Sequence, residues 1–276
     1  MSRYLQTILF FLSMTFFTQS VNAQDMPPDI ARIIKRGTLR VTILKPDVPG
    51  FHYHDAQGQL DGYDIEVGKD MARHLGVKAV FYAQSTLLDD LGNDVVEGKA
   101  DVIVSYSLFT KRAERVIYSR PQIIFNQALL VNNLIVSRNK WPLDPSQLLK
   151  KPGLTFATLA GSSFIDVIKS QYPTVRVVSY QNINEAFEDV KNGKIFGVFY
   201  VDKLLTRWLY EHPEANLYTR VLILPNKKMP IGMAVSWRDS HLMDWINTYI
   251  TIIQSDGTLS YFKKKFFGSP YEDEIQ

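Results

Sequence analysis

Two hydroxyls and a guanidinium lie close together between residues 101 and 119. Ser105 and Ser107 follow the apolar run 102–104, whose uncharged, β-branched residues are typical of a buried strand. Arg112 follows a short loop, where a helical turn is predicted to begin. Hydroxyls form single hydrogen bonds, and a guanidinium presents a planar fork that fits a carboxylate. The segment therefore predicts half of a site for a small anion such as a carboxylate. The alternative is a surface arginine beside two serines of a turn.

The elements before this segment place the two serines at the edge of a sheet. Predicted strands alternate with predicted helices, and this order is typical of a mostly parallel sheet covered by helices. In open α/β sheets, ligands bind just beyond the carboxyl ends of the strands, which is where Ser105 and Ser107 are expected. The predicted strands are 38–43, 78–82 and 102–104, and the predicted helices are 65–75 and 87–95.

The alternation begins again in the second half of the chain, after an extended apolar segment, 119–134, and a loop, 141–152. Gly98-Lys99 and Gly193-Lys194 each end a predicted helix and lead into an apolar strand. We therefore expect two lobes of one architecture. The further predicted elements are strands 154–158, 175–179, 195–200 and 231–236, a turn at 225–230, and helices that begin near residues 164, 186, 203, 242 and 259.

The composition is that of an ordinary globular protein, with 46% hydrophobic and 21% charged residues and a net charge of +3. Lysine and arginine are spread along the chain and form no basic stripe, so nucleic-acid binding is not predicted. There is no cysteine, which excludes disulfides and thiolate metal sites. His52 and His54 share one side of an extended segment, but no third ligand is near. They are expected to be solvated, and neither a metal nor a cofactor is predicted.

The first 23 residues carry the pattern of a secretory signal peptide. Arg3 provides the positive start, residues 8–17 form an apolar core too short to span a bilayer, and Val21-Asn22-Ala23 fits a cleavage site. We expect cleavage after Ala23 and an exported, soluble, periplasmic protein. An uncleaved anchor is the alternative.

Several short motifs recur in an order and spacing that match one known family. The chain resembles family 3 of the periplasmic solute-binding proteins, which feed polar amino acids to ABC transporters. The matching residues are Gly62-Tyr63-Asp64-Ile65, Gly98-Lys99-Ala100-Asp101, Arg112 with Tyr118-Ser119, Ala128-Leu129-Leu130-Val131, Ala160-Gly161-Ser162-Ser163, Gly232-Met233-Ala234-Val235, Asp256-Gly257-Thr258-Leu259 and Phe267-Gly268.

The resemblance implies an α/β fold of the type II periplasmic-binding-protein kind, with two lobes, two hinge strands and the ligand in the interlobe cleft. Lobe 1 is expected to comprise residues 24–122 and 231–276, and lobe 2 residues 123–230 with the hinge segments. The family closes around its ligand by hinge bending, and the transporter reads the closed form. A monomer with an ABC transporter permease as its partner is therefore expected.

The resemblance also assigns the site residues. Arg112 and Ser107 are expected to bind the ligand's α-carboxylate, with Ser105 close by. Ser162 and Ser163 lie at a predicted helix N-terminus, where free N–H groups attract an anion; Ser162 is also a candidate helix cap. Further expected contacts are Leu159, Tyr53 and Asp202.

Three positions depart from the family pattern. Val48 takes the place of a stacking aromatic residue, although Phe51 and Tyr53 are near, and Phe164 replaces a polar residue after the serine pair. The carboxylate that holds the ligand's ammonium is displaced by one residue, so that Val201 occupies its position and Asp202 follows. Asp202 then either caps the next helix or reaches the ligand through a bulge. If Asp202 does not reach the ligand's ammonium, a carboxylate without an amine is the alternative ligand.

The expected function is capture of a small carboxylated solute, in the first place an amino acid, for an ABC importer, without catalysis. One alternative is a periplasmic dehydratase acting on prephenate or arogenate, which would need a general acid in the cleft; another is a ligand-sensing module. A lytic transglycosylase is not expected, because its catalytic domain has no room before residue 276.

Overall fold

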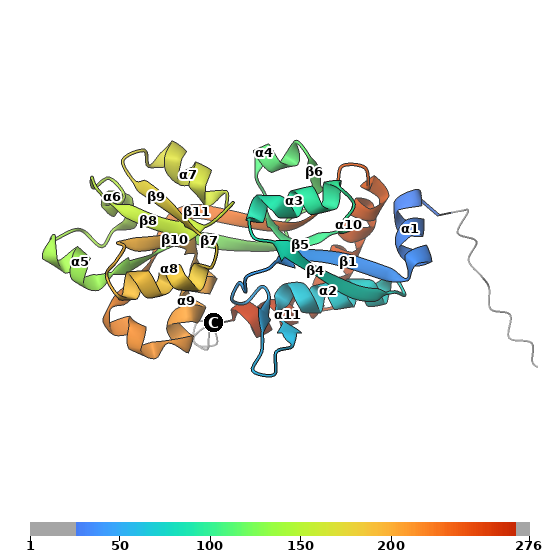
Figure 1. The fold of residues 1–276 in the computed structure, drawn as a ribbon, viewed down its shortest axis with the longest axis horizontal. Helices are drawn as coiled ribbons and strands as arrows, with labels where there is room; N and C mark the ends of the chain where they lie inside the picture. Colours follow the sequence, from blue (N-terminus) through green and yellow to red (C-terminus); the bar gives the residue numbers. More distant parts are fainter. Residues whose placement is uncertain (1–25, 269–276) are drawn as a thin grey trace, which may run out of the picture.

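Two long strands, β7 (Ile123–Asn132) and β11 (Thr219–Ser236), run between two α/β lobes in the computed structural model, which describes residues 26–268 (Figure 1). The two strands pair in antiparallel fashion along most of their length. They lie inside one seven-stranded sheet with the order β5-β11-β7-β10-β8-β9, and β6 also pairs with β11. One sheet therefore continues from one lobe into the other. We refer to α1–β6 with α10 and α11 as lobe 1, and to α5–η2 as lobe 2.

Lobe 1 contains the expected parallel strands covered by helices. Strand β1 pairs with β4 in parallel, and a parallel bridge from Val41 to Val102 joins β1 to the start of β5. Its elements are α1 (Pro28–Arg36), β1 (Thr38–Leu44), β2 (Tyr53–His54), β3 (Leu60–Asp61), α2 (Tyr63–His74), β4 (Lys78–Ser85), α3 (Leu88–Val96), β5 (Ile103–Ser107), α4 (Thr110–Ala113), β6 (Val116–Tyr118), α10 (Ser240–Ser255) and α11 (Thr258–Phe267).

A buried carboxylate fixes the start of β5, the strand that carries Ser105 and Ser107. Asp101 is 1% exposed and accepts hydrogen bonds from the backbone N–H of Arg40, 2.8 Å away, and from the guanidinium groups of Arg36 and Arg40. A buried charge is tolerated only when it is paired in this way. The two arginines therefore hold the β1–β5 junction in place behind the site.

Lobe 2 repeats the plan with its own strands. Strand β10 pairs with β7 in antiparallel fashion and with β8 in parallel, and β8 pairs with β9 in parallel. Its elements are α5 (Asn133–Arg138), α6 (Pro145–Leu148), β8 (Thr155–Leu159), α7 (Phe164–Gln171), β9 (Arg176–Tyr180), α8 (Ile183–Lys191), β10 (Gly197–Val201), α9 (Asp202–Glu211) and η2 (Pro213–Leu217).

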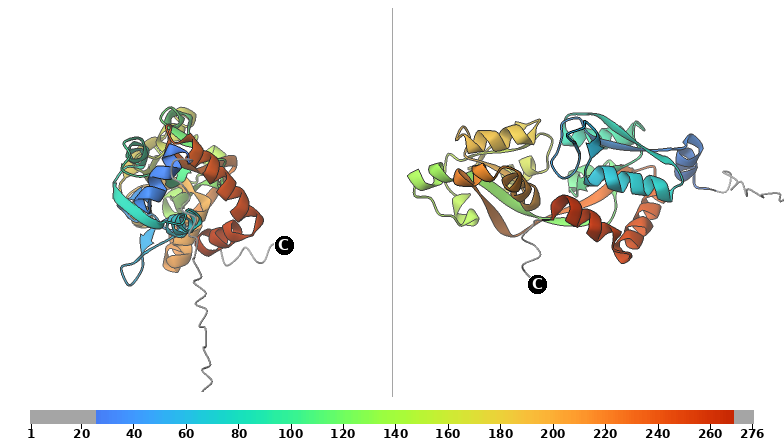
Figure 2. Two further views of the ribbon diagram at one scale, coloured as in Figure 1. Left: turned by 90° about the vertical axis from the view of Figure 1, so that its right-hand side faces the viewer. Right: turned by 90° about the horizontal axis from the view of Figure 1, so that it is seen from below.

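The last two helices return to lobe 1, as Figure 2 shows from two further directions. The backbone N–H of Leu242, in the first turn of α10, donates to the carboxylate of Asp29 on α1 at 2.9 Å. Tyr249 on α10 donates to Asp70 on α2 at 2.8 Å. Early and late parts of the sequence are therefore joined in one lobe by buried hydrogen bonds.

Two sequence predictions are wrong in detail. The turn expected at residues 225–230 is an irregularity within the continuous strand β11, where the pairing with β7 shifts between Ile223 and Lys228 and Asn226 has a φ of 58°. The loop expected at 141–152 contains the short helix α6, whose N-cap Asp144 accepts from the backbone N–H of Gln147. Prolines prompted both predictions, but a proline also fits an irregular strand position and the first turn of a helix.

Within residues 26–268 we find no helix with the length and apolar character that a bilayer-spanning segment requires. The predicted signal peptide and its cleavage after Ala23 lie outside the described residues.

Candidate functional site

The carboxyl end of β5 in lobe 1 meets the start of α7 in lobe 2. Ser107 Oγ lies 3.2 Å from Ser163 Oγ, and Arg112 Nη2 donates to the carbonyl oxygen of Gly161 at 2.7 Å. The backbone N–H of Leu88, at the first position of α3, donates to the carbonyl oxygen of Ala160 at 3.1 Å. These contacts join the two lobes directly, so the structure represents a closed arrangement.

Arg112 is held on every side, although it lies in an interlobe crevice. Its Nε donates to Asp89 at 2.8 Å, and its Nη1 donates to Ser107 Oγ at 2.7 Å. The guanidinium carbon lies 4.2 Å from the ring centroid of Tyr106, a cation–π contact. The side chain is buried, yet its partner Asp89 is 64% exposed. A fixed guanidinium with a solvent-screened counter-ion is well prepared to bind a second anion.

The crevice around Arg112, which we call the Arg112 crevice, has a volume of about 190 Å³. Ser162 and Ser163 line it from lobe 2, and Lys111 and Arg115 add positive charge from lobe 1. Ser162 Oγ accepts from the backbone N–H of Phe164, the first residue of α7, at 3.2 Å, although the N-cap position itself is occupied by Ser163 and not by Ser162 as expected. The structure thus brings Arg112, Ser107, Ser162 and Ser163 together in one place between the lobes.

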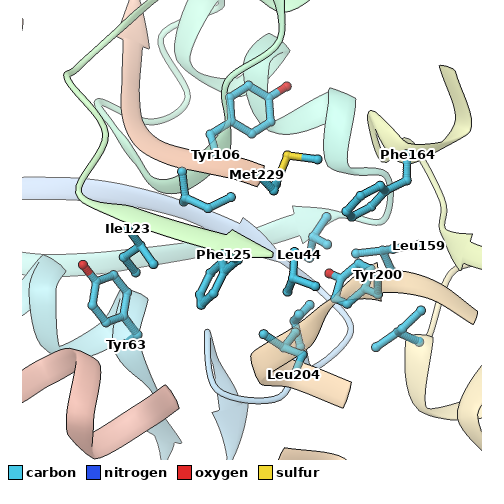
Figure 3. Close-up of a cluster of buried hydrophobic side chains, with 14 of the residues drawn as sticks. Leu44, Tyr63, Tyr106, Ile123, Phe125, Leu159, Phe164, Tyr200, Leu204 and Met229 are labelled. Atoms are coloured by element: carbon cyan, nitrogen blue, oxygen red, sulfur yellow. The ribbon is translucent and has the colours of Figure 1, made fainter. Parts of the chain in front are cut away.

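A second, smaller cavity lies beside this crevice and shares Ser162 with it; we call it the inner cavity. Its volume is about 60 Å³. Figure 3 shows several of its apolar walls converging from both lobes and from the hinge strands. The apolar walls include Leu44, Val48, Phe51, Leu88, Ile103, Phe164, Tyr200, Val201, Met229 and Ile231, and the polar ones include His52, Asp64, Ser105 and Ser107.

A histidine and an aspartate are buried together at the wall of the inner cavity. His52 is 4% exposed and Asp64 is 6% exposed, and His52 Nδ1 lies 3.5 Å from Asp64 Oδ2. The prediction of a solvated His52 is therefore wrong, whereas His54 is exposed and lies 2.8 Å from Asp47. Burial raises the pKa of the Asp64 carboxyl, and its neighbours His52 and Ser105 partly oppose that effect.

Sequence reasoning did not place His52 or Asp64 in the site. Asp64 belongs to the Gly62-Tyr63-Asp64-Ile65 motif, which contributed to the family resemblance but carried no assigned contact. Helix α2 does begin at Tyr63, and its first turn holds Asp64, where the positive helix end favours a carboxylate. Ser105, which was expected near the ligand, has its Oγ buried at the same cavity.

The structure does not bring Asp202 to either space. Its Oδ1 accepts from the backbone N–H of Asn126 at 3.0 Å, and its Oδ2 accepts from the Asn126 side chain at 2.7 Å. Asp202 thereby fastens α9 to the hinge strand β7, while Val201 lines the inner cavity. The one-residue displacement noted in the sequence is not restored by a bulge.

Two other expected contacts also lie elsewhere. Leu159 is 1% exposed at the end of β8, and its carbonyl oxygen accepts from the backbone N–H of Ser162 at 3.0 Å, which supports the serine turn from behind. The hydroxyl of Tyr53 donates to Asp61 at 3.2 Å, and its ring lies under Arg207. Tyr53 therefore lines a separate groove, and Phe51 is the aromatic residue of its loop that reaches the inner cavity.

Neither space has the composition of a metal centre. In the described part of the chain, no group of three or more histidine and carboxylate side chains is arranged to hold a metal ion.

Comparisons with known proteins agree with this architecture. Residues 40–269 match the model of the bacterial extracellular solute-binding proteins, family 3. The chain is 25% identical over 220 residues to the ABC transporter arginine-binding protein 1 of Escherichia coli K12, which covers 79% of this chain and 86% of that protein.

Two solved structures are similar throughout. The solute receptor for L-cysteine of Neisseria gonorrhoeae shares 25% identity with a TM-score of 0.76, over 90% of this chain and 96% of that one. The ancestral amino acid-binding protein AncCDT-1, described as a precursor of cyclohexadienyl dehydratase, shares 26% identity with a TM-score of 0.74, over 86% of this chain and 98% of that one.

The close approach of the lobes gives a first prediction. Gly161 has a φ of 71°, and a Cβ there would lie 2.7 Å from the backbone nitrogen of Leu88 in the other lobe. Gly161→Ala should therefore oppose closure and weaken ligand binding about 10-fold or more, since overpacking costs about 1–3 kcal/mol. Isothermal titration with a ligand found by screening would measure this.

Gly153→Ala is the matched control, because Gly153 has a similar φ of 76° but open space around its Cβ position. Both variants carry the same backbone strain. Equal affinities for the two would contradict the role of the Gly161 contact in closure.

Asp64 gives a second prediction. Burial raises the pKa of its carboxyl in the folded protein. At pH values between the ordinary pKa of an aspartate and this raised pKa, Asp64 is protonated in the folded state and ionised in the unfolded state. The Asp64 contribution to stability should therefore fall as the pH rises through that window. Asp64→Asn removes this contribution, so its free energy of unfolding relative to the wild type should increase with pH.

Urea unfolding of the ligand-free protein from pH 4 to pH 8 would test this. Asp244→Asn, on the exposed face of α10, is the control. A difference between wild type and Asp64→Asn that does not change with pH would show that burial does not raise this pKa.

Proposed function

The chain belongs to the bacterial extracellular solute-binding proteins of family 3, and from that premise we propose that it captures a small carboxylated solute, an amino acid, for an ABC importer. The ligand lies in the interlobe cleft, and closure of the lobes presents the loaded form to a transporter permease. The protein acts as a monomer in the periplasm after cleavage of its leader behind Ala23. Names of its relatives, such as the arginine-binding protein of Escherichia coli, support an amino acid as the solute.

One observation carries this proposal. Arg112 presents five N–H donors and uses four hydrogen bonds to hold itself against Asp89, Ser107 and Gly161. The guanidinium lines a crevice that Ser162, Ser163 and the start of α7 close from the other lobe, and its counter-ion Asp89 is 64% exposed. A carboxylate placed there receives hydrogen bonds from both lobes, so it stabilises the closed form over the open one.

Catalysis on the same scaffold is less well supported. A dehydratase needs a general acid in the cleft, and Asp64 is the carboxyl group that lines the inner cavity. However, that cavity has a volume of about 60 Å³, well below the roughly 150 Å³ of an engineered cavity that binds a single benzene ring. A cyclic substrate with additional carboxyl groups does not fit beside Asp64, so we propose binding without chemistry.

Removal of the Arg112 guanidinium tests the proposal. A thermal-shift screen of the common amino acids and small organic acids should identify a ligand, which at 100 times its Kd adds about 2.7 kcal/mol to the free energy of unfolding. Arg112→Ala should weaken binding of that ligand by at least about 30-fold, because truncating one partner of a buried charge pair costs about 2–5 kcal/mol.

Arg115→Ala is the control, since Arg115 lines the same crevice but is exposed and donates to Asn93. It should change the affinity less than threefold. If Arg112→Ala binds the ligand as the wild type does, the anion site lies elsewhere.

A further inference from the structure

Three hydrogen-bonding atoms without a partner converge on the inner cavity. In the described part of the chain, five buried side-chain polar atoms lack a hydrogen bond, and three of them, His52 Nδ1, Asp64 Oδ1 and Ser105 Oγ, belong to residues that line this cavity. Buried polar groups are normally satisfied, because leaving one unpaired costs free energy. Three unpaired atoms at one small cavity indicate that a ligand supplies their partner.

We infer that His52, Asp64 and Ser105 form the ammonium-binding end of the ligand site, and that the ligand is an amino acid with a small side chain. This inference rests on the proposed function and makes it more specific. The ammonium is held from lobe 1, in place of a carboxylate at the end of β10, where Val201 now lines the cavity and Asp202 is bound to Asn126.

The environment of His52 determines what it offers to the cavity. Its Nε2 lies 3.2 Å from the carbonyl oxygen of Pro46, an atom that can only accept, so Nε2 carries the proton. In the neutral ring Nδ1 is then an acceptor, and it faces Asp64 Oδ2, which is another acceptor, at 3.5 Å. When Asp64 is ionised both atoms are acceptors, and a primary ammonium, with three N–H donors, supplies hydrogen bonds to both.

The positions of the two serines on β5 set the direction of the ligand. Ser105 and Ser107 are two residues apart on one strand, so they share a face and lie about 7 Å apart. Ser107 contacts Arg112, and Ser105 lies at the cavity with Asp64. A short zwitterion can therefore place its carboxylate toward Ser107 and the Arg112 crevice and its ammonium toward Ser105.

The remaining walls limit the side chain. Leu44, Phe164, Tyr200, Val201 and Met229 supply no charged group that could meet a second ligand charge, and the cavity volume is only about 60 Å³. Glycine, alanine and short ω-amino acids such as β-alanine have the chemistry and the size that these walls accept.

Calorimetric titration of the mature chain at pH 7.5 would test the inference with paired probes. Glycine, L-alanine, β-alanine and γ-aminobutyrate would each be compared with the acid that lacks the amine, namely acetate, propionate or butyrate. At least one amino acid should bind, and its deaminated partner should bind at least 100-fold more weakly. The probe that binds also decides between an α-amine and an ω-amine.

Two isosteric variants then locate the ammonium. Asp64→Asn should weaken binding of the amino acid at least 30-fold and leave binding of the deaminated acid within threefold. Asp202→Asn, which alters a buried carboxylate outside both spaces, should leave both affinities within threefold, with circular dichroism confirming that each variant is folded. The reverse pattern, in which Asp202→Asn weakens binding and Asp64→Asn does not, overturns the inference.

The ring of His52 gives an independent readout. Nitrogen-15 chemical shifts of the liganded protein at pH 7.5 should show a neutral ring protonated on Nε2. A doubly protonated ring would mean that His52 pairs with Asp64 by itself, and the inference would be wrong.

Failure of the inference and failure of the proposed function give different results. If only large amino acids bind, or if acids without an amine bind as well as the small amino acids, the inference fails while the proposed function stands. If no amino acid or organic acid binds, both fail.

Discussion

The guanidinium of Arg112 is the group on which the arrangement of the two lobes depends. It is buried, it donates to Ser107 at the end of β5 in its own lobe, and it donates to the carbonyl oxygen of Gly161 in the other lobe. A buried charge is stable only with such partners. The buried position of the guanidinium therefore depends in part on the Gly161 carbonyl that lobe 2 brings to it. Gly161 makes this approach possible, because any larger residue would place its Cβ against the backbone of α3.

The distribution of polar and apolar groups in the cleft depends on the position of its carboxylate. With Asp202 bound to Asn126 on the hinge strand, lobe 2 presents Phe164, Tyr200 and Val201 to the inner cavity and no ionised group. The remaining carboxylate is Asp64 in lobe 1, at the positive end of α2 and against His52. The cleft is therefore polar at the ends of β5 and α2 and apolar opposite them, which suits a ligand smaller and less charged than arginine.

Much of this arrangement could be predicted from the sequence. The features that were missed depend on contacts between segments that are distant in the sequence. Ser107, Arg112 and the serine pair before α7 were predictable, because a strand end and a helix start are encoded by neighbouring residues. The displacement of Asp202 was also visible as a one-residue offset. The burial of His52 was not, because it depends on α2 packing against a loop that has few apolar residues. The irregular β11 was missed because the segment 225–230, with two prolines and an asparagine, resembles a turn unless its partner strand is known.

The unpaired atoms of the inner cavity also suggest why a ligand should favour closure of the lobes. In the closed arrangement Asp64 is removed from water. Its pKa is raised because an ionised carboxyl is less stable in this buried position than in water. His52 Nδ1 and Ser105 Oγ lie beside Asp64, but within residues 26–268 neither completes a hydrogen bond of normal geometry, so burial of both carries a penalty. An open cleft lessens the penalty on the side that lobe 2 covers, although α2 and the His52 loop still bury Asp64 within lobe 1. A ligand that donates hydrogen bonds to these groups lessens the penalty without opening. In the proposed site, the differential affinity that drives closure comes from both ends: Arg112 gains an anion, and the Asp64 side gains hydrogen-bond donors. A solute that binds only at the Arg112 end or only at the Asp64 end would leave polar groups at the other end buried without hydrogen bonds. The same unpaired groups would therefore determine both which solute binds and whether the lobes close around it.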